Sequence, residues 1–231
     1  MKPEGKQYTA LVGNQEFLIE TGRLAGQAGG AVTLRVGDTM IFVAATMSGE
    51  PRQGVDFFPL TVDYEERMYA GGRIPGSFFR REGRPTEEAI LTARLTDRPL
   101  RPLFPKDLRN DVQVIMYAFS TDGITPIDIL AVNAASAALM ISDIPWGGPV
   151  GAVRVGLIDG EFILNPSFPE QERSMLDLRL AGTSDAILMV ECGAAEVSEE
   201  VMLKALDFGH KALQPIIERL LPGIATGCSW S

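Results

Sequence analysis

Residues 127–141, which read IDILAVNAASAALMI, are the stretch that most strongly indicates the fold. Wound into a helix, this segment places apolar or small residues on nearly every face, and a helix that is apolar all round is a buried one. Its many alanines also allow neighbouring elements to approach closely. We therefore expect residues 127–141 to form a helix inside the core.

Short strand patterns flank this segment on both sides. Residues 32–36 and 40–43 alternate around a Gly37-Asp38 turn and predict a hairpin. Residues 56–64 predict another strand, in which Pro59 indicates a sheet edge or a bulge. The remaining predicted strands are residues 112–119, a hairpin of residues 150–155 and 162–164, and residues 176–180 and 187–190.

Two further helices complete the predicted set. Thr86 begins one that runs to Arg98, with Pro99 as its stop. Ser198 begins the last one, which Pro215 is expected to kink. Strands thus come in runs interrupted by helices rather than in strict alternation with them. This order favours an α+β layered domain over a doubly wound sheet, and no repeat or internal linker divides the chain.

Length and composition are those of an ordinary globular protein. The 231 residues are 45% hydrophobic and 22% charged, which excludes the disordered and fibrous classes. Two cysteines are too few for a disulfide framework, and residues 1–20 lack the apolar core of a secretory signal, so we expect a reduced, cytoplasmic protein. No run approaches 18 apolar residues, so no membrane partner is expected.

The distribution of charge matters more than its total. The net charge of −9 argues, taken alone, against a nucleic-acid partner. Residues 73–109 nevertheless hold nine basic and five acidic residues, a local charge of +4, against −13 over the rest of the chain. Eight of the nine are arginine, whose planar guanidinium suits phosphate. This segment predicts a local anion site; the alternative is a solvated charged face.

Within that segment, residues 76–83 form a glycine-flanked loop with two aromatic and two basic side chains. Phe78 and Phe79 are adjacent, and Arg80 and Arg81 follow directly. Stacking of an unpaired base on an aromatic ring contributes about 1–3 kcal/mol, and arginine adds phosphate contacts. The loop therefore predicts binding of single-stranded nucleic acid. The alternative is that one phenylalanine packs inward and the arginines are merely solvated.

Two candidate sites lie further along the chain. Arg94 and Arg98 share one helix face, and Arg101 follows beyond the predicted stop, while Leu91 and Leu95 lie on a different, core-facing side. The arginines either clamp a phosphate or form an internal network with the acidic residues of the same helix. Asp177 and Arg179 alternate with leucines on one strand face. They either hold Mg²⁺ and an anion or pair with each other, and no metal-ligand motif accompanies them.

Long and irregular motifs give a family resemblance. Residues 56–62, 69–85 and 97–105 closely resemble the first ribonuclease-PH-like domain of the bacterial polynucleotide phosphorylases. The match extends to about Leu220. We therefore predict that residues 1–221 form this domain and that residues 222–231 are a tail that does not match the family.

The resemblance implies both a fold and an activity. The fold is α+β, ribonuclease PH-like (ribosomal protein S5 domain 2-like). The activity is that of a polyribonucleotide nucleotidyltransferase, in which inorganic phosphate and Mg²⁺ degrade single-stranded RNA from 3′ to 5′ into nucleoside diphosphates. A homotrimeric ring threads the RNA, and the equivalents of Phe78, Phe79, Arg80 and Arg81 line its constriction.

The resemblance implies that the phosphorolytic centre of this family belongs to the second domain. The corresponding residues of the present chain differ from those of that centre. Residues 122–128 stand where that centre has a serine-rich phosphate loop. Asp177 matches one of its two aspartates, Gln171 replaces the other, and Arg179 replaces its lysine. We expect no catalytic residue and no metal in this domain: Asp177 and Arg179 are vestigial, and Mg²⁺ belongs to the full enzyme.

These observations leave three hypotheses for the function. The leading one is a fragment that supplies RNA binding and ring assembly but is itself inactive, with Arg94, Arg98 and Arg101 as an anion site near the vestigial centre. The second is a stand-alone ribonuclease-PH-type exoribonuclease that uses Asp177. The third is a non-catalytic ring subunit.

Overall fold

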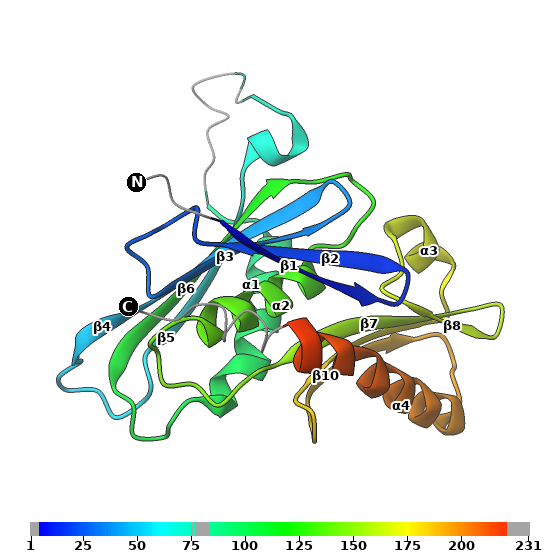
Figure 1. Cartoon of the computed structure of the whole chain (residues 1–231). Helices are drawn as coiled ribbons and strands as arrows, with labels where there is room; N and C mark the ends of the chain where they lie inside the picture. The colour runs from blue at the N-terminus through cyan, green and yellow to red at the C-terminus, as the bar shows by residue number, and fades with distance from the viewer. Residues whose placement is uncertain (1–4, 75, 77–83, 221–231) are drawn as a thin grey trace.

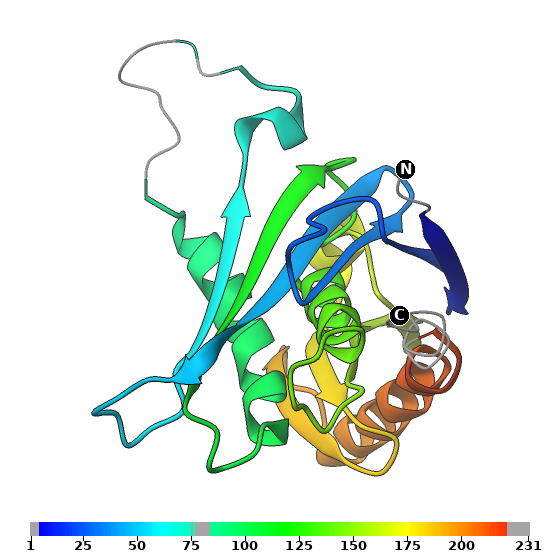
Figure 2. The same ribbon diagram turned by 60° about the vertical axis from the view of Figure 1, so that its left-hand side comes forward.

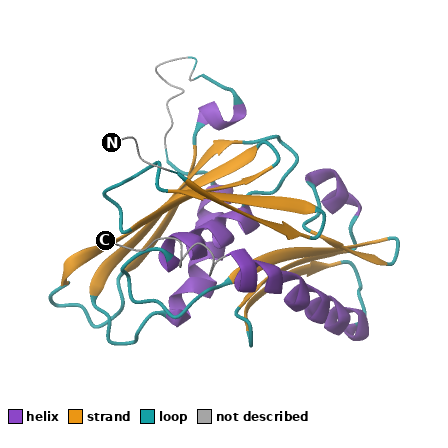
Figure 3. Cartoon of the chain, viewed as in Figure 1, coloured by secondary structure: helices purple, strands orange, loops and turns teal. Residues whose placement is uncertain are grey.

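Two β-sheets, with helices between and beside them, make up the chain (Figures 1 and 3). The structure is a computed structural model and describes residues 5–74, 76 and 84–220. The larger sheet has the strand order β1-β2-β3-β4-β6-β5, and all its neighbours are antiparallel except β5 and β6. Its strands are β1 (Lys6–Val12), β2 (Gln15–Thr21), β3 (Gly30–Val36), β4 (Thr39–Pro51), β5 (Leu60–Glu66) and β6 (Asn110–Ser120).

The smaller sheet is antiparallel throughout, in the order β10-β9-β7-β8. Its strands are β7 (Gly151–Ile158), β8 (Glu161–Leu164), β9 (Leu176–Gly182) and β10 (Ile187–Ala194). The helices are α1 (Glu87–Leu100), α2 (Asp128–Met140), α3 (Phe168–Arg173) and α4 (Glu199–Pro215), with short turns η1 (Met68–Gly71), η2 (Arg101–Leu103) and η3 (Ile216–Leu220). The strands follow one another in runs along the chain, and the helices pack in layers against the two sheets. This arrangement confirms the predicted α+β class.

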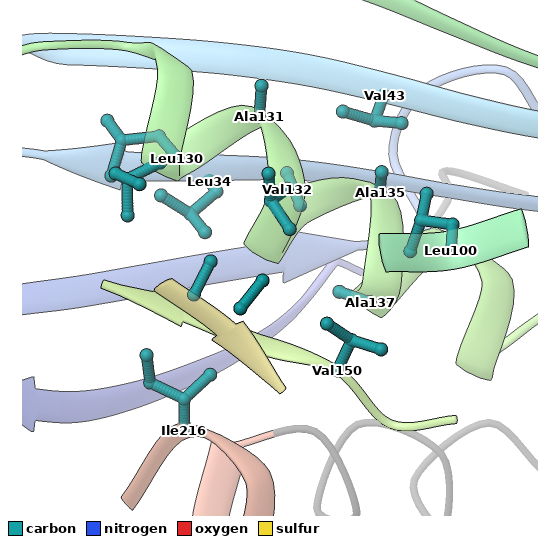
Figure 4. Packing of buried hydrophobic residues seen from close by; sticks show 14 of the residues in the cluster. Leu34, Val43, Leu100, Leu130, Ala131, Val132, Ala135, Ala137, Val150 and Ile216 are labelled. Carbon is teal, nitrogen blue, oxygen red and sulfur yellow. The ribbon is translucent and has the colours of Figure 1, made fainter. Parts of the chain in front are cut away.

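Helix α2 lies between the two sheets and contacts β3 and β4 on one side and β7 on the other. Residues 129–139 are all buried, because neighbours cover the helix on every side, as its composition predicted. Gly30 of β3 permits the close approach: a Cβ there would lie 2.1 Å from the carbonyl oxygen of Ala138. The surrounding core, shown in Figure 4, includes Leu34, Val43, Leu100, Val132, Val150 and Ile216.

Helices α1 and α4 cover different faces. Helix α1 packs on β5 and α2, and it connects the parallel strands β5 and β6. Helix α4 packs on β7 and β9 from the side opposite α2, as Figure 2 shows. Its Gly209 lets the backbone approach the side chains of Val153 and Leu180, which point away from α2. None of the described helices is long and apolar enough to cross a membrane.

Most predicted elements are confirmed, and the differences have local causes. The hairpin at Gly37-Asp38 forms, and β5 is an edge strand that begins directly after Pro59. Pro99 does not stop α1, because it sits in the last turn and the helix ends at Leu100. At Pro215 α4 ends and the chain continues as the π-helical turn η3. Strands β1 and β2 and the short helix α3 were not predicted.

Candidate functional site

An open cavity of about 570 Å³ lies where α1, the start of α2 and one face of the smaller sheet converge. Helix α1 contributes the side chains of Leu91, Arg94 and Arg98 to its wall. The first turn of α2 contributes Asp128, and α3 contributes Phe168 and Gln171. The sheet contributes Arg154, Arg179 and Glu191.

Strand register brings the three sheet residues together. Arg154 of β7 pairs in register with Arg179 of β9, which pairs in turn with Glu191 of β10. Directly opposed residues in antiparallel strands point to the same face, so these three side chains form a row beneath α2. Asp177 lies two residues before Arg179 and shares that face.

Arg154 is the centre of an ion-pair network in this cavity. Its side chain is only 7% exposed. Nε and Nη2 donate to the two carboxylate oxygens of Asp177 at 2.6 and 2.7 Å, a bidentate pair. Nη1 donates to Oδ2 of Asp128 at 3.3 Å. The guanidinium thus ties β9 to the beginning of α2.

Arg179 extends the network toward α1. Its Nη1 donates to Oε1 of Glu191 at 2.7 Å, and its Nε lies 3.2 Å from Oδ2 of Asp128. The second oxygen of Glu191 accepts from Nη1 of Arg98 at 3.0 Å. We call this set the arginine–carboxylate network; its three cations and three anions are Arg98, Arg154, Arg179, Asp128, Asp177 and Glu191.

These contacts favour the second of the two possibilities left open for Asp177 and Arg179, because both residues belong to one ion-pair network (Nη2 of Arg179 to Oδ2 of Asp177, 3.4 Å). Both oxygens of Asp177 accept hydrogen bonds from Arg154, and Gln171 donates to the carbonyl of Pro166. A divalent cation needs free carboxylate oxygens, and an adjacent guanidinium repels it. The residues present therefore do not fit Mg²⁺. Across the described ranges, no group of three or more acidic, histidine or cysteine side chains is placed to hold a metal.

The three arginines predicted as one anion site are separated in the structure. Arg101 does not line the cavity: its guanidinium donates to both oxygens of Asp97 at 3.0 and 2.7 Å and to the carbonyls of Phe58 and Leu60. Arg101 thus makes the internal ion pair that the sequence left open as the alternative to a phosphate clamp.

Of the two arginines that remain, Arg98 pairs with Glu191, and exposed Arg94 lines the cavity with no ion-pair partner in the part of the chain that is described. Arg94 is thus the side chain most available to an incoming anion. Leu91 was also misplaced: it is 60% exposed at the cavity, whereas Leu95 is buried as predicted.

In residues 122–128, which stand in place of the phosphate loop, the donors of the loop bond to a carboxylate of the same segment. Burial alone would raise the pKa of Asp122, but hydrogen bonds from the backbone N–H groups of Thr125 and Ile124 and from the Thr125 hydroxyl outweigh it and lower the pKa to about 2. These are donors that a phosphate loop would present to its anion. Here the Asp122 carboxylate already accepts them, so the loop has fewer donors to offer.

Phe78, Phe79, Arg80 and Arg81 lie outside the described residues, and their role as an RNA-binding loop stays a prediction. The described flank η1 lies at the end of β5, away from the smaller sheet (Figure 2). Sequence reasoning missed Arg154 as the centre of the network. The available signal was a single arginine inside the apolar strand β7, because a buried cation requires a partner.

The layered arrangement, with α2 between a mixed and an antiparallel sheet, defines the class as a ribonuclease-PH-like fold. The solved structure of Rrp46 from rice (Oryza sativa) is similar, with a TM-score of 0.70 and 16% identity over 99% of this chain and 96% of that one. The Archaeoglobus fulgidus exosome "with RNA bound to the active site" has a TM-score of 0.65 at 19% identity, covering 92% and 86%. Both confirm the predicted fold.

The family follows from the sequence comparison. The model of the 3′ exoribonuclease family, domain 1, matches residues 14–145, and domain 2 of that family matches residues 148–212. The chain belongs to the 3′ exoribonuclease family. The first match covers most of the larger sheet with α1 and α2, and the second covers the smaller sheet and most of α4.

Similar curated proteins are polyribonucleotide nucleotidyltransferases. Those of Heliobacterium modesticaldum, Thermus thermophilus and Roseiflexus castenholzii are 57%, 55% and 61% identical over 91%, 94% and 87% of this chain. The chain spans 27–30% of their length. The predicted resemblance is thus confirmed. The boundary at residue 221 and the separate tail stay predictions.

Proposed function

We propose that this chain is the first ribonuclease-PH-like domain of a polyribonucleotide nucleotidyltransferase. The whole protein degrades single-stranded RNA from 3′ to 5′ by phosphorolysis, releasing nucleoside diphosphates, and works as a cytoplasmic homotrimer. The chain supplies RNA binding and ring assembly, while inorganic phosphate and Mg²⁺ act at a centre elsewhere in the protein. The proposal is supported by relatives of that name that are 54–61% identical to the chain.

The arginine–carboxylate network is the observation that carries the division of labour. Phosphorolysis needs a site that attracts phosphate and stabilises the charge that develops on the phosphodiester. In this cavity three guanidinium groups are matched by three carboxylates, and the network has no net charge to offer. Freeing Asp177 for a metal would leave Arg154 buried without its bidentate partner, which is costly.

RNA binding is assigned to the segment that precedes α1 in the sequence and to Arg94 of α1. We place the bases on Phe78 and Phe79 and the phosphates on Arg80 and Arg81, as the sequence predicts. Arg94 is the described residue best suited to join them, because it is exposed at the cavity and lacks an ion-pair partner among the described residues. Phosphate contacts of this kind release counterions, so affinity depends on salt.

Binding of the chain to fluorescein-labelled oligo(A) across a salt series tests this assignment. We expect log affinity to fall with log salt by about 0.7 per phosphate contact, and Arg80→Ala or Arg94→Ala to lower that slope by about 0.7. Phe79→Ala should weaken binding about 5- to 150-fold at every salt concentration.

Arg173→Ala is the matched control, because Arg173 is exposed and its one ion pair with a described residue is to exposed Asp159, at 3.5 Å in the turn between β7 and β8. If Phe79→Ala, Arg80→Ala and the control all bind RNA like the parent chain, the assignment of RNA binding to this loop is wrong.

A further inference from the structure

A second cavity, of about 250 Å³, lies on the outer face of the larger sheet. Strand alternation identifies this face: Val112, Val114, Met116 and Ala118 of β6 are buried toward α2, so Tyr117 and Phe119 point the other way. Six residues that line the cavity carry the argument: Glu20, Arg23, Leu24, Thr33, Met40 and Phe119. The sheet separates this site from the arginine–carboxylate network.

One wall of the cavity is the end of an aromatic stack. The ring of Phe119 lies 5.3 Å from that of Phe42 with an interplanar angle of 5°, and Phe42 lies 6.4 Å from Tyr117 at 11°. The guanidinium carbon of Arg67 lies 5.4 Å from the centroid of the Tyr117 ring. A cation therefore covers one end of the series, and at the other end Phe119 lines the cavity.

The opposite wall is polar. Thr33 is in register with Glu20 on one side and with Phe42 on the other, so its side chain shares their face of the sheet and lies between them. Oε1 of Glu20 is buried and lies 2.7 Å from Nε of Arg23, but it accepts no hydrogen bond from the described residues. A buried acceptor of this kind fits a ligand that donates an N–H. Arg23 pairs with the Glu20 carboxylate, and its side chain is 61% exposed, so a ligand anion could reach it at the rim.

We propose that this cavity binds the amino-bearing purine base of a nucleotide. The base would continue the series of rings on Phe119, its exocyclic amine would donate to Glu20 or Thr33, and its phosphate would meet Arg23. The volume supports a single planar ring system, because pockets for larger organic ligands measure about 300–1,000 Å³. The base comes either from free nucleotide or from single-stranded RNA. The inference does not depend on the proposed phosphorolytic function.

Fluorescence of 2-aminopurine riboside 5′-monophosphate tests the site, because stacking quenches this base. We expect saturable quenching by the full chain and about 5- to 150-fold weaker binding to Phe119→Leu. Leu24→Trp should also abolish binding, since the larger side chain fills the cavity from a position that is 44% exposed and outside the core. Phe57→Leu removes an exposed aromatic ring elsewhere and should bind like the parent chain. Circular dichroism melting curves confirm that each variant is folded.

Two further arms identify the source of the base. AMP should displace the probe more effectively than UMP, because the purine stacks more strongly. If 2-aminopurine inside a nine-residue oligo(A) is quenched and that quenching also needs Phe119, the site takes RNA; if only the mononucleotide depends on Phe119, it takes free nucleotide. The proposal is overturned if the mononucleotide is not quenched, or if Phe119→Leu and Leu24→Trp bind it as tightly as Phe57→Leu does.

Discussion

Replacing Arg154 by methionine tests whether the arginine–carboxylate network holds the smaller sheet against α2. The change keeps most of the side-chain volume but removes three hydrogen bonds, two to Asp177 and one to Asp128. Breaking a buried ion pair by removing one partner costs about 3–5 kcal/mol, because the other charge remains desolvated.

For Arg154→Met we expect a loss of stability at the lower end of that range. The side chains of Asp177 and Asp128 are 39% and 15% exposed, so water partly solvates the first, and Arg179 still lies 3.2 Å from the second. We expect a loss of about 3 kcal/mol in the free energy of unfolding. For a chain of this size that corresponds to a fall of roughly 6–12 °C in Tm.

Urea unfolding followed by circular dichroism measures the effect, and a double-mutant cycle isolates the pair. Arg154→Met with Asp177→Leu replaces both charges, so it should lose less stability than Arg154→Met alone. Arg173→Ala breaks an exposed ion pair and should change stability by about 0.5 kcal/mol or less. The reasoning is refuted if Arg154→Met costs less than about 1 kcal/mol, or if the two substitutions are additive.

Two other substitutions test the packing and the closed loop. Gly30→Ala should lower the free energy of unfolding by about 3 kcal/mol or prevent folding, because the added Cβ would clash with the carbonyl oxygen of Ala138. Gly26→Ala is the control in the same urea titration, because the space around Gly26 is open. The pKa of Asp122 is lowered to about 2, so its carboxylate stabilises the folded chain above pH 4, and this stabilisation is lost as the pH falls toward 2. Because Asp122 is exposed, we expect the contribution to be only about 1 kcal/mol. Asp122→Asn should therefore be less stable than the parent chain at pH 6 and close to it at pH 2.5; an equal gap at both pH values would contradict this.

Much of the fold could be predicted from local patterns. The fully apolar segment of α2 indicated a helix in the core, and Gly37-Asp38 and Pro59 indicated a turn and an edge strand, because these signals act within a few residues. Strand β1 was missed because its alternation is weak: Lys6–Val12 has only one buried residue. Strand β2 buries Phe17 and Ile19 on one face, but apolar Leu18 between them hides the alternation in the sequence. The end of α1 was misplaced because a proline in the last turn removes a hydrogen bond without stopping the helix.

The site was less accessible to sequence reasoning because it depends on register between distant strands. Asp177 and Arg179 were identified from their alternation with leucines on one strand, but their partners come from β7, β10 and α2. Arg101 was considered together with Arg94 and Arg98, yet it pairs with Asp97, four residues earlier in α1. Helical spacing offered both the phosphate clamp and this internal pair, and it could not decide between them.

Phosphorolysis by the purified chain is the measurement that tests the central claim most directly. The chain is incubated with oligo(A), inorganic phosphate and Mg²⁺, and ADP release is quantified beside the full-length Thermus thermophilus relative as a positive control. We predict RNA binding without ADP release above the level of an Asp177→Asn variant, because Arg154 occupies the carboxylate that a metal would need. Appreciable ADP release that Asp177→Asn abolishes would contradict the account and establish the chain as a stand-alone phosphorolytic exoribonuclease.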